Sequence, residues 1–201
     1  KADILTIRIE KTNLLDVMKF LKNNDDFLFT QLTDLCAVDY STFGISEWET
    51  EQSTSTGYNR GINPQSHGRI KFGDISDNKK SQDRFCIVYH LLSIKHNSRI
   101  RVKVYLDDQD MVLPSIVDIW AAADWYEREA FDLFGILFEG HPDLRRLLTD
   151  YGFIGHPFRK DFPLVGNTQV RYDPTLKKII HEPVDIEPRV LVPRVIRESE
   201  K

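Results

Sequence analysis

Apolar and polar positions in the N-terminal half of the chain alternate in a way that predicts strands and one early helix. Residues 5–10 alternate strictly, which predicts an amphipathic strand. The next apolar positions have the spacing of one helix face: Leu14, Val17, Met18 and Leu21. Thr12 or Asn13 can cap this helix at its N-terminus. A second strand is expected near residues 35–39, where apolar and β-branched side chains gather.

Two further strands are predicted in the middle of the chain. Residues 85–94 are apolar on both alternating faces, which is typical of a central strand covered on both sides. Residues 99–106 alternate cleanly, and their polar face consists of Arg99, Arg101, Lys103 and Tyr105. Three cations on one strand face can bind an acidic partner or nucleic acid, although a solvated surface is the commoner explanation.

A longer helix is expected from about residue 121 to Phe134. Gly135 is placed to end this helix in a left-handed turn. The polar stripe of the helix is narrow and consists of Asp124, Arg128 and Asp132. Their spacing of four residues allows a ladder of ion pairs along the helix surface.

Glu127 and Glu129 lie among apolar positions of the same helix, where a carboxylate must pair with a cation, accept hydrogen bonds or be protonated. General acid/base catalysis is one interpretation of the pair. At i and i+2, however, the two side chains point about 200° apart and cannot share one substrate. We favour a structural role, in which each carboxylate holds the following segment through a cation. The candidate cations are Arg145, Arg146, Arg159 and Lys160.

After Gly135 the sequence predicts an extended arm. Prolines recur at intervals too short for long elements, yet aromatic and aliphatic side chains continue. Residues 144–171 hold five cations and two carboxylates, and five minus two gives a net charge of +3. An apolar segment with little scope for its own core needs a partner to cover it. The residues expected to contact that partner are Tyr151, Phe153, Phe158, Arg159, Lys160, Phe162, Arg171 and Tyr172.

These patterns predict an α+β fold with two parts. Residues 1–135 form a domain in which helices pack on a small mixed sheet of about four strands. Residues 136–201 form an extended, Pro-rich C-terminal arm that docks on a partner subunit. Residues 44–83 are polar, rich in Gly, Ser and Asn, and without periodicity, so they predict an insertion within the domain.

Composition and motifs argue against several kinds of site. The net charge of −4 disfavours nucleic acid or an anionic membrane as the main partner, and no apolar run reaches the ~18–20 residues that span a bilayer. Cys36 and Cys86 are too few for an iron–sulfur cluster, and whether they pair is left open. No nucleotide-phosphate loop occurs. For His141 and His156 we favour helix capping or hydrogen bonds to a partner over metal binding. No catalytic, cofactor-binding or metal-binding residue is expected.

One long ordered string of residues resembles a known family. The string comprises Trp125, Tyr126, Glu127, Arg128, Glu129, Asp132, Phe134 and Gly135, followed by His141, Pro142, Asp143, Leu144, Arg145, Arg146, Leu147 and Leu148. It is similar to the signature of the 30 kDa subunit of respiratory NADH:ubiquinone oxidoreductase, complex I. The continuation over residues 150–164 and 170–173 resembles the mitochondrial and closely related bacterial branch of that family.

The resemblance implies a structural subunit without a cofactor of its own in the peripheral arm of complex I. That complex passes electrons from NADH through FMN and iron–sulfur clusters to ubiquinone and pumps protons. The implied partners are the large quinone-site subunit and cluster-bearing neighbours. The implied location is the matrix face of the mitochondrial inner membrane, or else the cytoplasmic face of a bacterial plasma membrane. The alternatives are a stand-alone acid/base enzyme that uses Glu127 or Glu129, and the equivalent subunit of a related plastid dehydrogenase or membrane-bound hydrogenase complex.

Overall fold

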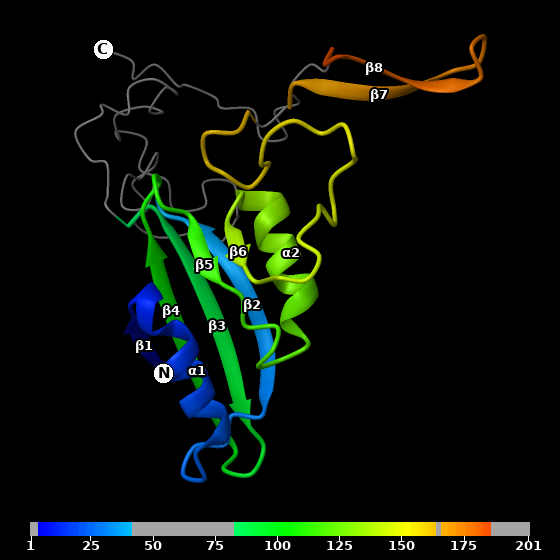
Figure 1. Cartoon of the computed structure of the whole chain (residues 1–201). Helices are drawn as coiled ribbons and strands as arrows, with labels where there is room; N and C mark the ends of the chain where they lie inside the picture. The colour runs from blue at the N-terminus through cyan, green and yellow to red at the C-terminus, as the bar shows by residue number, and fades with distance from the viewer. Residues whose placement is uncertain (1–3, 42–82, 164–165, 186–201) are drawn as a thin grey trace, which may run out of the picture. The chain divides into compact units, whose positions relative to one another are not determined.

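Contacts within the chain divide it into two compact units, Lys1–Lys160 and Asp161–Lys201. The computed structural model describes residues 4–41, 83–163 and 166–185 (Figure 1). We describe each unit by itself.

The predicted insertion at residues 44–83 lies outside the described residues, apart from its last residue. Contacts group residues 136–160 with the first unit, although the sequence pattern assigned them to the arm. Docking of the arm on a partner stays a prediction.

The first unit is built on a four-stranded mixed sheet, as predicted. Its strands are β1 (Leu5–Ile9), β2 (Gln31–Asp39), β3 (Phe85–Ser93) and β4 (Ser98–Leu106). Their order across the sheet is β1-β4-β3-β2, in which β1 runs parallel to β4 and the other neighbours are antiparallel. Most residues of β3 are buried, which confirms the predicted central strand.

Two helices, α1 (Leu14–Asn23) and α2 (Ala123–Phe134), cover one face of this sheet (Figure 1). A short 3-10 helix, η1 (Lys11–Asn13), precedes α1. The predicted side-chain cap of α1 is wrong, because Asn13 stands at the N-cap position without a side-chain hydrogen bond. Asn13 has φ −99° and ψ 3°, outside the extended region that turns a capping side chain toward the first helical N–H groups.

The hydrophobic core lies between the helices and the inward face of the sheet. Its largest fully buried apolar side chains include Leu14, Met18, Leu35, Phe85, Ile87, Tyr89 and Leu91. The helical spacing predicted for α1 therefore corresponds to the face that packs on the strands.

Two very short strands flank α2, namely β5 (Val112–Pro114) and β6 (Leu137–Glu139), and they pair in parallel. The backbone N–H of Ser115 also donates to the Glu139 carbonyl at 2.8 Å. The chain before α2 is thereby joined to the chain after it, so that both ends of the helix have fixed neighbours.

The second unit contains one hairpin, formed by β7 (Thr168–Asp173) and β8 (Lys178–Pro183). The sequence pattern predicted no regular element there. The strand register places Val170 opposite His181 and Tyr172 opposite Ile179 on one face. Tyr172 and Ile179 are 60% and 63% exposed, so this face is largely uncovered.

Candidate functional site

Asp132, in the last turn of α2, is the most highly coordinated carboxylate in the described residues. Its Oδ2 accepts hydrogen bonds from the backbone N–H groups of Leu147, Leu148 and Thr149 at 2.7–3.0 Å. Its Oδ1 accepts from the guanidinium of Arg146 at 3.1 Å and from the Thr149 hydroxyl. Burial raises the pKa of Asp132, but these hydrogen bonds outweigh burial and the pKa is lowered. The helix therefore holds residues 146–149 through one buried, ionised carboxylate.

Two arginines complete this arrangement. The nearly buried Arg128 donates to the carbonyl oxygens of Arg145 and Arg146 at 3.2 and 3.3 Å. Arg146 in turn donates to the Gly155 carbonyl from both terminal nitrogens, each at 3.1 Å. The predicted ion-pair ladder along the helix surface is wrong, because Arg128 and Asp132 point into the loop and bind its backbone instead.

The end of α2 is closed by donors from further along the chain. The ring Nδ1 of His156 donates to the Asp132 carbonyl at 2.9 Å, and the backbone N–H of Phe158 donates to the Leu133 carbonyl at 3.1 Å. The Nε of Arg159 donates to the Phe134 carbonyl at 2.6 Å. The last carbonyls of a helix have no partner within it, so these three bonds stabilise the helix end. The expected capping role is thus confirmed for His156.

Gly135 follows these carbonyls and ends α2 in the left-handed conformation, with φ 77°. A Cβ atom at this position would lie 2.6 Å from both Arg159 Nη2 and His156 Nε2. Glycine is therefore required twice, for the turn and for the close approach of the two capping side chains.

Glu127 is fully buried, but it binds the segment before α2 rather than the segment after it. Its Oε2 accepts from the Ser115 hydroxyl at 2.6 Å, and its Oε1 accepts from the Ile116 N–H at 2.8 Å. The expected arginine partner is wrong for this residue, because both oxygens are bonded to residues 115 and 116. Burial raises the pKa of Glu127, and the two hydrogen bonds offset only part of that rise.

The other acidic and aromatic signature positions of α2 are closer to the surface. Glu129 is partly exposed, and its carboxylate forms no ion pair within the described part of the chain. An arginine partner for Glu129 is therefore wrong as well. The Tyr126 hydroxyl donates to the Thr33 carbonyl of β2 at 3.3 Å, and Trp125 is 65% exposed.

His141 fixes the start of the segment after β6. Its Nε2 lies 3.1 Å from the Asp124 carbonyl, and its Nδ1 accepts from the Asp143 N–H at 3.0 Å. Because a carbonyl only accepts, Nε2 carries the proton in the neutral ring. Pro142 and Arg145 are exposed and Leu144 packs partly on the core.

Asp39, at the end of β2, is a second buried carboxylate, and it binds residues that are distant from it in the sequence. It binds Arg84 through both oxygens at 3.0 and 3.2 Å and accepts from the Ser41 and Lys160 N–H groups, each at 2.9 Å. Burial raises the pKa of Asp39, but the bonds to Arg84, Lys160 and Ser41 lower it by more. Asp39 and Asp132 together fix both ends of residues 145–160, which we call the carboxylate-bound loop.

The carboxylate-bound loop exposes large apolar side chains although its backbone is held. Leu148, Tyr151 and Ile154 are 63%, 104% and 75% exposed. Phe158 is also exposed, but its ring packs nearly at right angles to the ring of Phe134, with 5.9 Å between ring centroids. Ordered backbone under exposed apolar side chains is typical of a surface prepared for a protein partner.

The predicted partner-contact residues are thus divided by the structure. Tyr151 and Tyr172 are exposed, and Phe153 lies within 5.9 Å of the Arg146 guanidinium. The guanidinium of Arg159 binds the Phe134 carbonyl at the end of α2 and lies over the ring of Phe85. It therefore stabilises the fold within this chain.

The remaining predicted contact residues have mixed surroundings. Lys160 exposes its side chain while its N–H is bound to Asp39, Phe162 is partly buried, and Arg171 pairs with Glu182 at 3.2 Å. Asp39, Leu148 and Ile154 were not among the predicted structural or partner-contact residues, although Leu148 belongs to the string that resembles the family. The Asp-Tyr end of β2 carries no motif, and the exposure of the two aliphatic residues follows from loop geometry.

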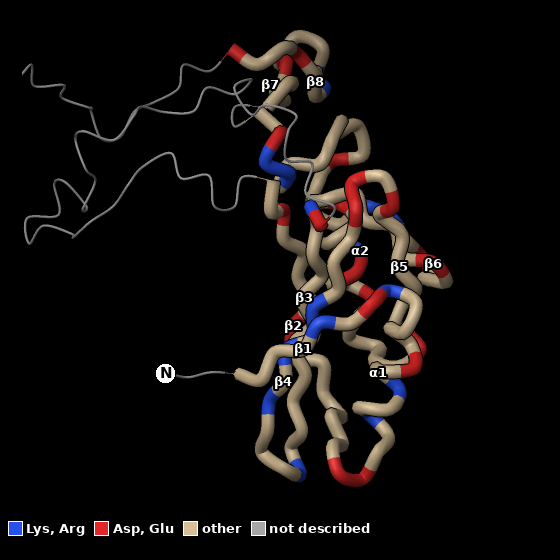
Figure 2. Tube along the Cα trace, turned by 90° about the vertical axis from the view of Figure 1, so that its left-hand side faces the viewer, with Lys and Arg blue, Asp and Glu red and all other residues tan. Residues whose placement is uncertain are grey.

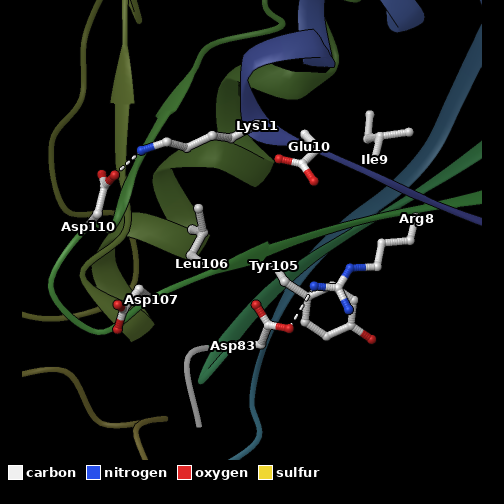
Figure 3. Close-up of a pocket in the computed structure, with 9 residues that line it drawn as sticks. All are labelled: Arg8, Ile9, Glu10, Lys11, Asp83, Tyr105, Leu106, Asp107 and Asp110. Carbon is white, nitrogen blue, oxygen red and sulfur yellow. Dashed lines mark hydrogen bonds and ion pairs between the residues drawn. The ribbon is translucent and has the colours of Figure 1, made fainter. Parts of the chain in front are cut away.

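A cavity of about 470 Å³ opens elsewhere in the first unit, beside β1 and β4 (Figure 3). Arg8 pairs with Asp83 at 2.6 Å and stacks on Tyr105, and Lys11 pairs with Asp110. Neither Glu127 nor Glu129 lines it. The cavity is polar and open, and it offers no support for the acid/base interpretation.

The described residues also contain features that bear on metal sites, reactive thiols and membrane-spanning helices. These residues contain no cluster of His, Cys, Asp or Glu suited to a metal ion. Cys36 and Cys86 are both free thiols, and burial raises the pKa of Cys86 to about 12. No helix within the described ranges is long and apolar enough to cross a membrane.

Comparisons with known proteins agree with the resemblance. The family described as "Respiratory-chain NADH dehydrogenase, 30 Kd subunit" matches residues 7–168. The C-type subunit of the NADH-quinone oxidoreductase of Coxiella burnetii is 53% identical over 98% of this chain and 83% of that protein. The protein of the same description from Halorhodospira halophila is 52% identical over 98% and 82%. A solved chain described as "Nqo5 of the trypsin-resistant fragment (1-134)" is 28% identical, with a TM-score of 0.47 over 69% of this chain and 81% of that chain.

Proposed function

The chain belongs to the family of the 30 kDa subunit of respiratory-chain NADH dehydrogenase, and we propose that it is a scaffolding subunit of an NADH:quinone oxidoreductase complex. Its role is to hold electron-carrying neighbours in register in the peripheral arm. FMN, iron–sulfur clusters and the quinone site then lie on other subunits, and this chain performs no chemistry of its own.

The observation that carries the proposal is the carboxylate-bound loop. Partly buried, charge-assisted hydrogen bonds to Asp39 and Asp132 hold this loop. The ordered loop exposes Leu148, Tyr151 and Ile154. Ordering the loop in advance removes part of the entropy that the loop itself would otherwise lose when a partner binds. A catalytic carboxylate instead needs access to substrate, and Glu127 has none, since it is fully buried with both oxygens bonded.

The hairpin of the second unit supports docking of the arm. An isolated two-stranded sheet is at best marginally stable in water. The face that carries Tyr172 and Ile179 is exposed, whereas the other face carries the polar cluster of Gln169, Arg171 and Glu182. We propose that the apolar face packs on a neighbouring subunit, with the large quinone-site subunit as the expected neighbour.

The relatives named above are bacterial, so the proposed location is the cytoplasmic face of a bacterial plasma membrane, within a membrane-associated complex. The test is to purify the tagged chain from solubilised membranes and to measure flavin, iron and NADH oxidation in the same fractions. The proposal predicts a large NADH-oxidising assembly that contains this chain, flavin and iron, and an isolated chain that oxidises no NADH. Recovery of the chain only as a small species without flavin or iron would contradict it.

A further inference from the structure

The face of the main sheet opposite to α1 and α2 carries arginine side chains that form no ion pair with the described residues. The register of β4 on β3 places Arg99 beside Leu92, Arg101 beside His90, and Lys103 beside Val88. β2 continues the same rows with Asp34 opposite His90 and Cys36 opposite Val88. We call these positions the basic sheet face: Asp34, Cys36, Val88, His90, Leu92, Arg99, Arg101 and Lys103.

The cations of the basic sheet face are poorly compensated. Arg99 and Arg101 form no ion pair with any residue that the structure describes, and Lys103 donates only to the Tyr40 hydroxyl at 3.4 Å. Arg8 of β1 adjoins Lys103 on the same face, but it pairs with Asp83 and adds no net charge. The three other cations against the carboxylate of Asp34 leave +2, in a chain whose net charge is −4. Figure 2 shows Lys and Arg positions, in blue, along strand β4. A local excess opposite in sign to the whole chain indicates a specific use for these charges.

Helices α1 and α2 lie on the other face of the sheet, and no described helix covers this one (Figure 1). The face combines arginines on β4 with apolar side chains on the central strand, of which Leu92 is partly exposed. Arginine beside a small apolar centre is the composition typical of protein interfaces.

We infer that the basic sheet face is a docking surface for an acidic surface of another protein subunit. This inference rests on the proposed function, because it gives the same scaffold a second contact, on a face of the sheet that the helices leave free. Charge complementarity selects this occupant, since Arg99 and Arg101 lack carboxylate partners among the described residues and a neighbour's Asp and Glu side chains can supply them.

Nucleic acid and anionic lipid fit the face less well. Because Arg8 is paired with Asp83, three unpaired cations remain on the face, fewer than the polybasic clusters of about four to eight that bind anionic lipid. Sequence-tolerant nucleic-acid surfaces add exposed aromatic platforms, whereas Tyr105 on this face of β4 is already stacked under Arg8 at 4.3 Å.

The test uses the whole complex and a matched charge control. Arg99→Glu with Arg101→Glu reverses two charges on the face, and Lys19→Glu with Lys95→Glu reverses two exposed charges outside it. We expect recovery of the face variant in the flavin-containing complex to fall about tenfold, because like charges then meet across the interface. The control variant should be recovered like the wild type, and both isolated variants should fold. Equal recovery of the two variants would overturn the inference.

A photo-crosslinking residue in place of Arg99 identifies what covers the face. The inference predicts a crosslink to an Asp- and Glu-rich segment of another subunit, and no such crosslink from the same residue in place of Lys19. A crosslink to lipid or nucleic acid, or none from an intact complex, would overturn it. Absence of the wild-type chain from any flavin-containing complex would instead refute the proposed function itself.

Discussion

Asp132 and Glu127 are both fully buried on α2, yet their surroundings shift their pKa values in opposite directions. Asp132 receives three backbone N–H groups, a hydroxyl and a guanidinium, which outweigh the cost of burial. Glu127 receives one hydroxyl and one N–H, which do not. The number of donors around each carboxylate decides the direction in which its pKa is shifted.

Asp132→Asn should destabilise the folded chain by about 2–4 kcal/mol, because it weakens several charge-assisted hydrogen bonds and leaves Arg146 without its buried partner. Urea unfolding followed by circular dichroism measures this loss. Asp143→Asn is the matched control, since Asp143 forms an exposed pair with Arg145 and should change stability by less than about 0.5 kcal/mol. Equal losses for both variants would show that Asp132 does not hold the loop.

The pH dependence of stability should separate the two carboxylates. The pKa of Asp132 is lowered below its usual value of 3.8, so its contribution is present above pH 3.8 and is lost as the pH falls through the folded-state pKa. The advantage of the wild type over Asp132→Asn should therefore shrink in acid. The pKa of Glu127 is raised above 4.5, so its contribution is present below pH 4.5 and is lost as the pH rises. The wild type should accordingly lose ground to Glu127→Gln above pH 4.5; a constant difference for either variant contradicts its assignment.

Gly135→Ala should cost more than Gly140→Ala, although both glycines are left-handed, with φ 77° and 83°. Both changes carry the backbone cost of about 1–2 kcal/mol. Only at Gly135 would the new Cβ meet His156 and Arg159, because nothing lies within 4 Å at Gly140. Unfolding midpoints of the two variants measure the difference, and equal midpoints would mean that the capping side chains do not pack on the helix end.

At the scale of elements, the carboxylate-bound loop behaves as an extension of α2. Arg146 binds Asp132, Thr149 and Gly155, whereas the side chain of the adjacent Arg145 pairs with exposed Asp143. The side chain of Arg146 therefore stabilises the loop, whereas the side chain of Arg145 contributes little.

Arg146→Ala should speed hydrogen exchange at the amides of Leu147, Leu148 and Thr149 by more than about tenfold, since their acceptor loses its charged partner. Arg145→Ala should leave those amides unchanged. Exchange measured by mass spectrometry on both variants provides the comparison, and equal acceleration would argue that the loop is held by something other than the Asp132 cluster.

The main strands and the helices were predictable from periodicity, because β4 and both helices bury one continuous face and β3 is apolar on both of its faces. The partners of the polar residues were not. Asp132 was expected on a solvated stripe and Glu127 beside an arginine, because spacing within a helix says nothing about which loop returns to cover it. The sequence correctly predicted that a carboxylate of α2 would pair with a cation of the following segment, here Arg146. That carboxylate is Asp132, at the C-terminal end of the helix, and not Glu127 or Glu129. The β7–β8 hairpin was missed although Val170 and Tyr172 alternate with polar residues, because closely spaced prolines such as Pro174 and Pro183 led to the prediction of an arm without regular elements.

At the scale of the whole molecule, buried contacts fix surfaces that, under the proposed function, other subunits cover. Exposed apolar residues lie on the carboxylate-bound loop and on the hairpin, and three cations without carboxylate partners among the described residues lie together on the basic sheet face. A scaffold of this kind should affect the amount of complex rather than the rate of its chemistry.

The most direct measurement is the NADH:quinone turnover per flavin, together with the total flavin-containing complex, in membranes with Leu148→Ser, Tyr151→Ser and Ile154→Ser combined. Phe20→Ser, at a residue that is 53% exposed on α1, is the control. We predict that the triple variant lowers the amount of assembled complex by about tenfold, while each complex that does assemble turns over like the wild type. A normal amount of complex with reduced turnover per flavin would contradict the scaffolding role and would indicate that this chain takes part in the reaction.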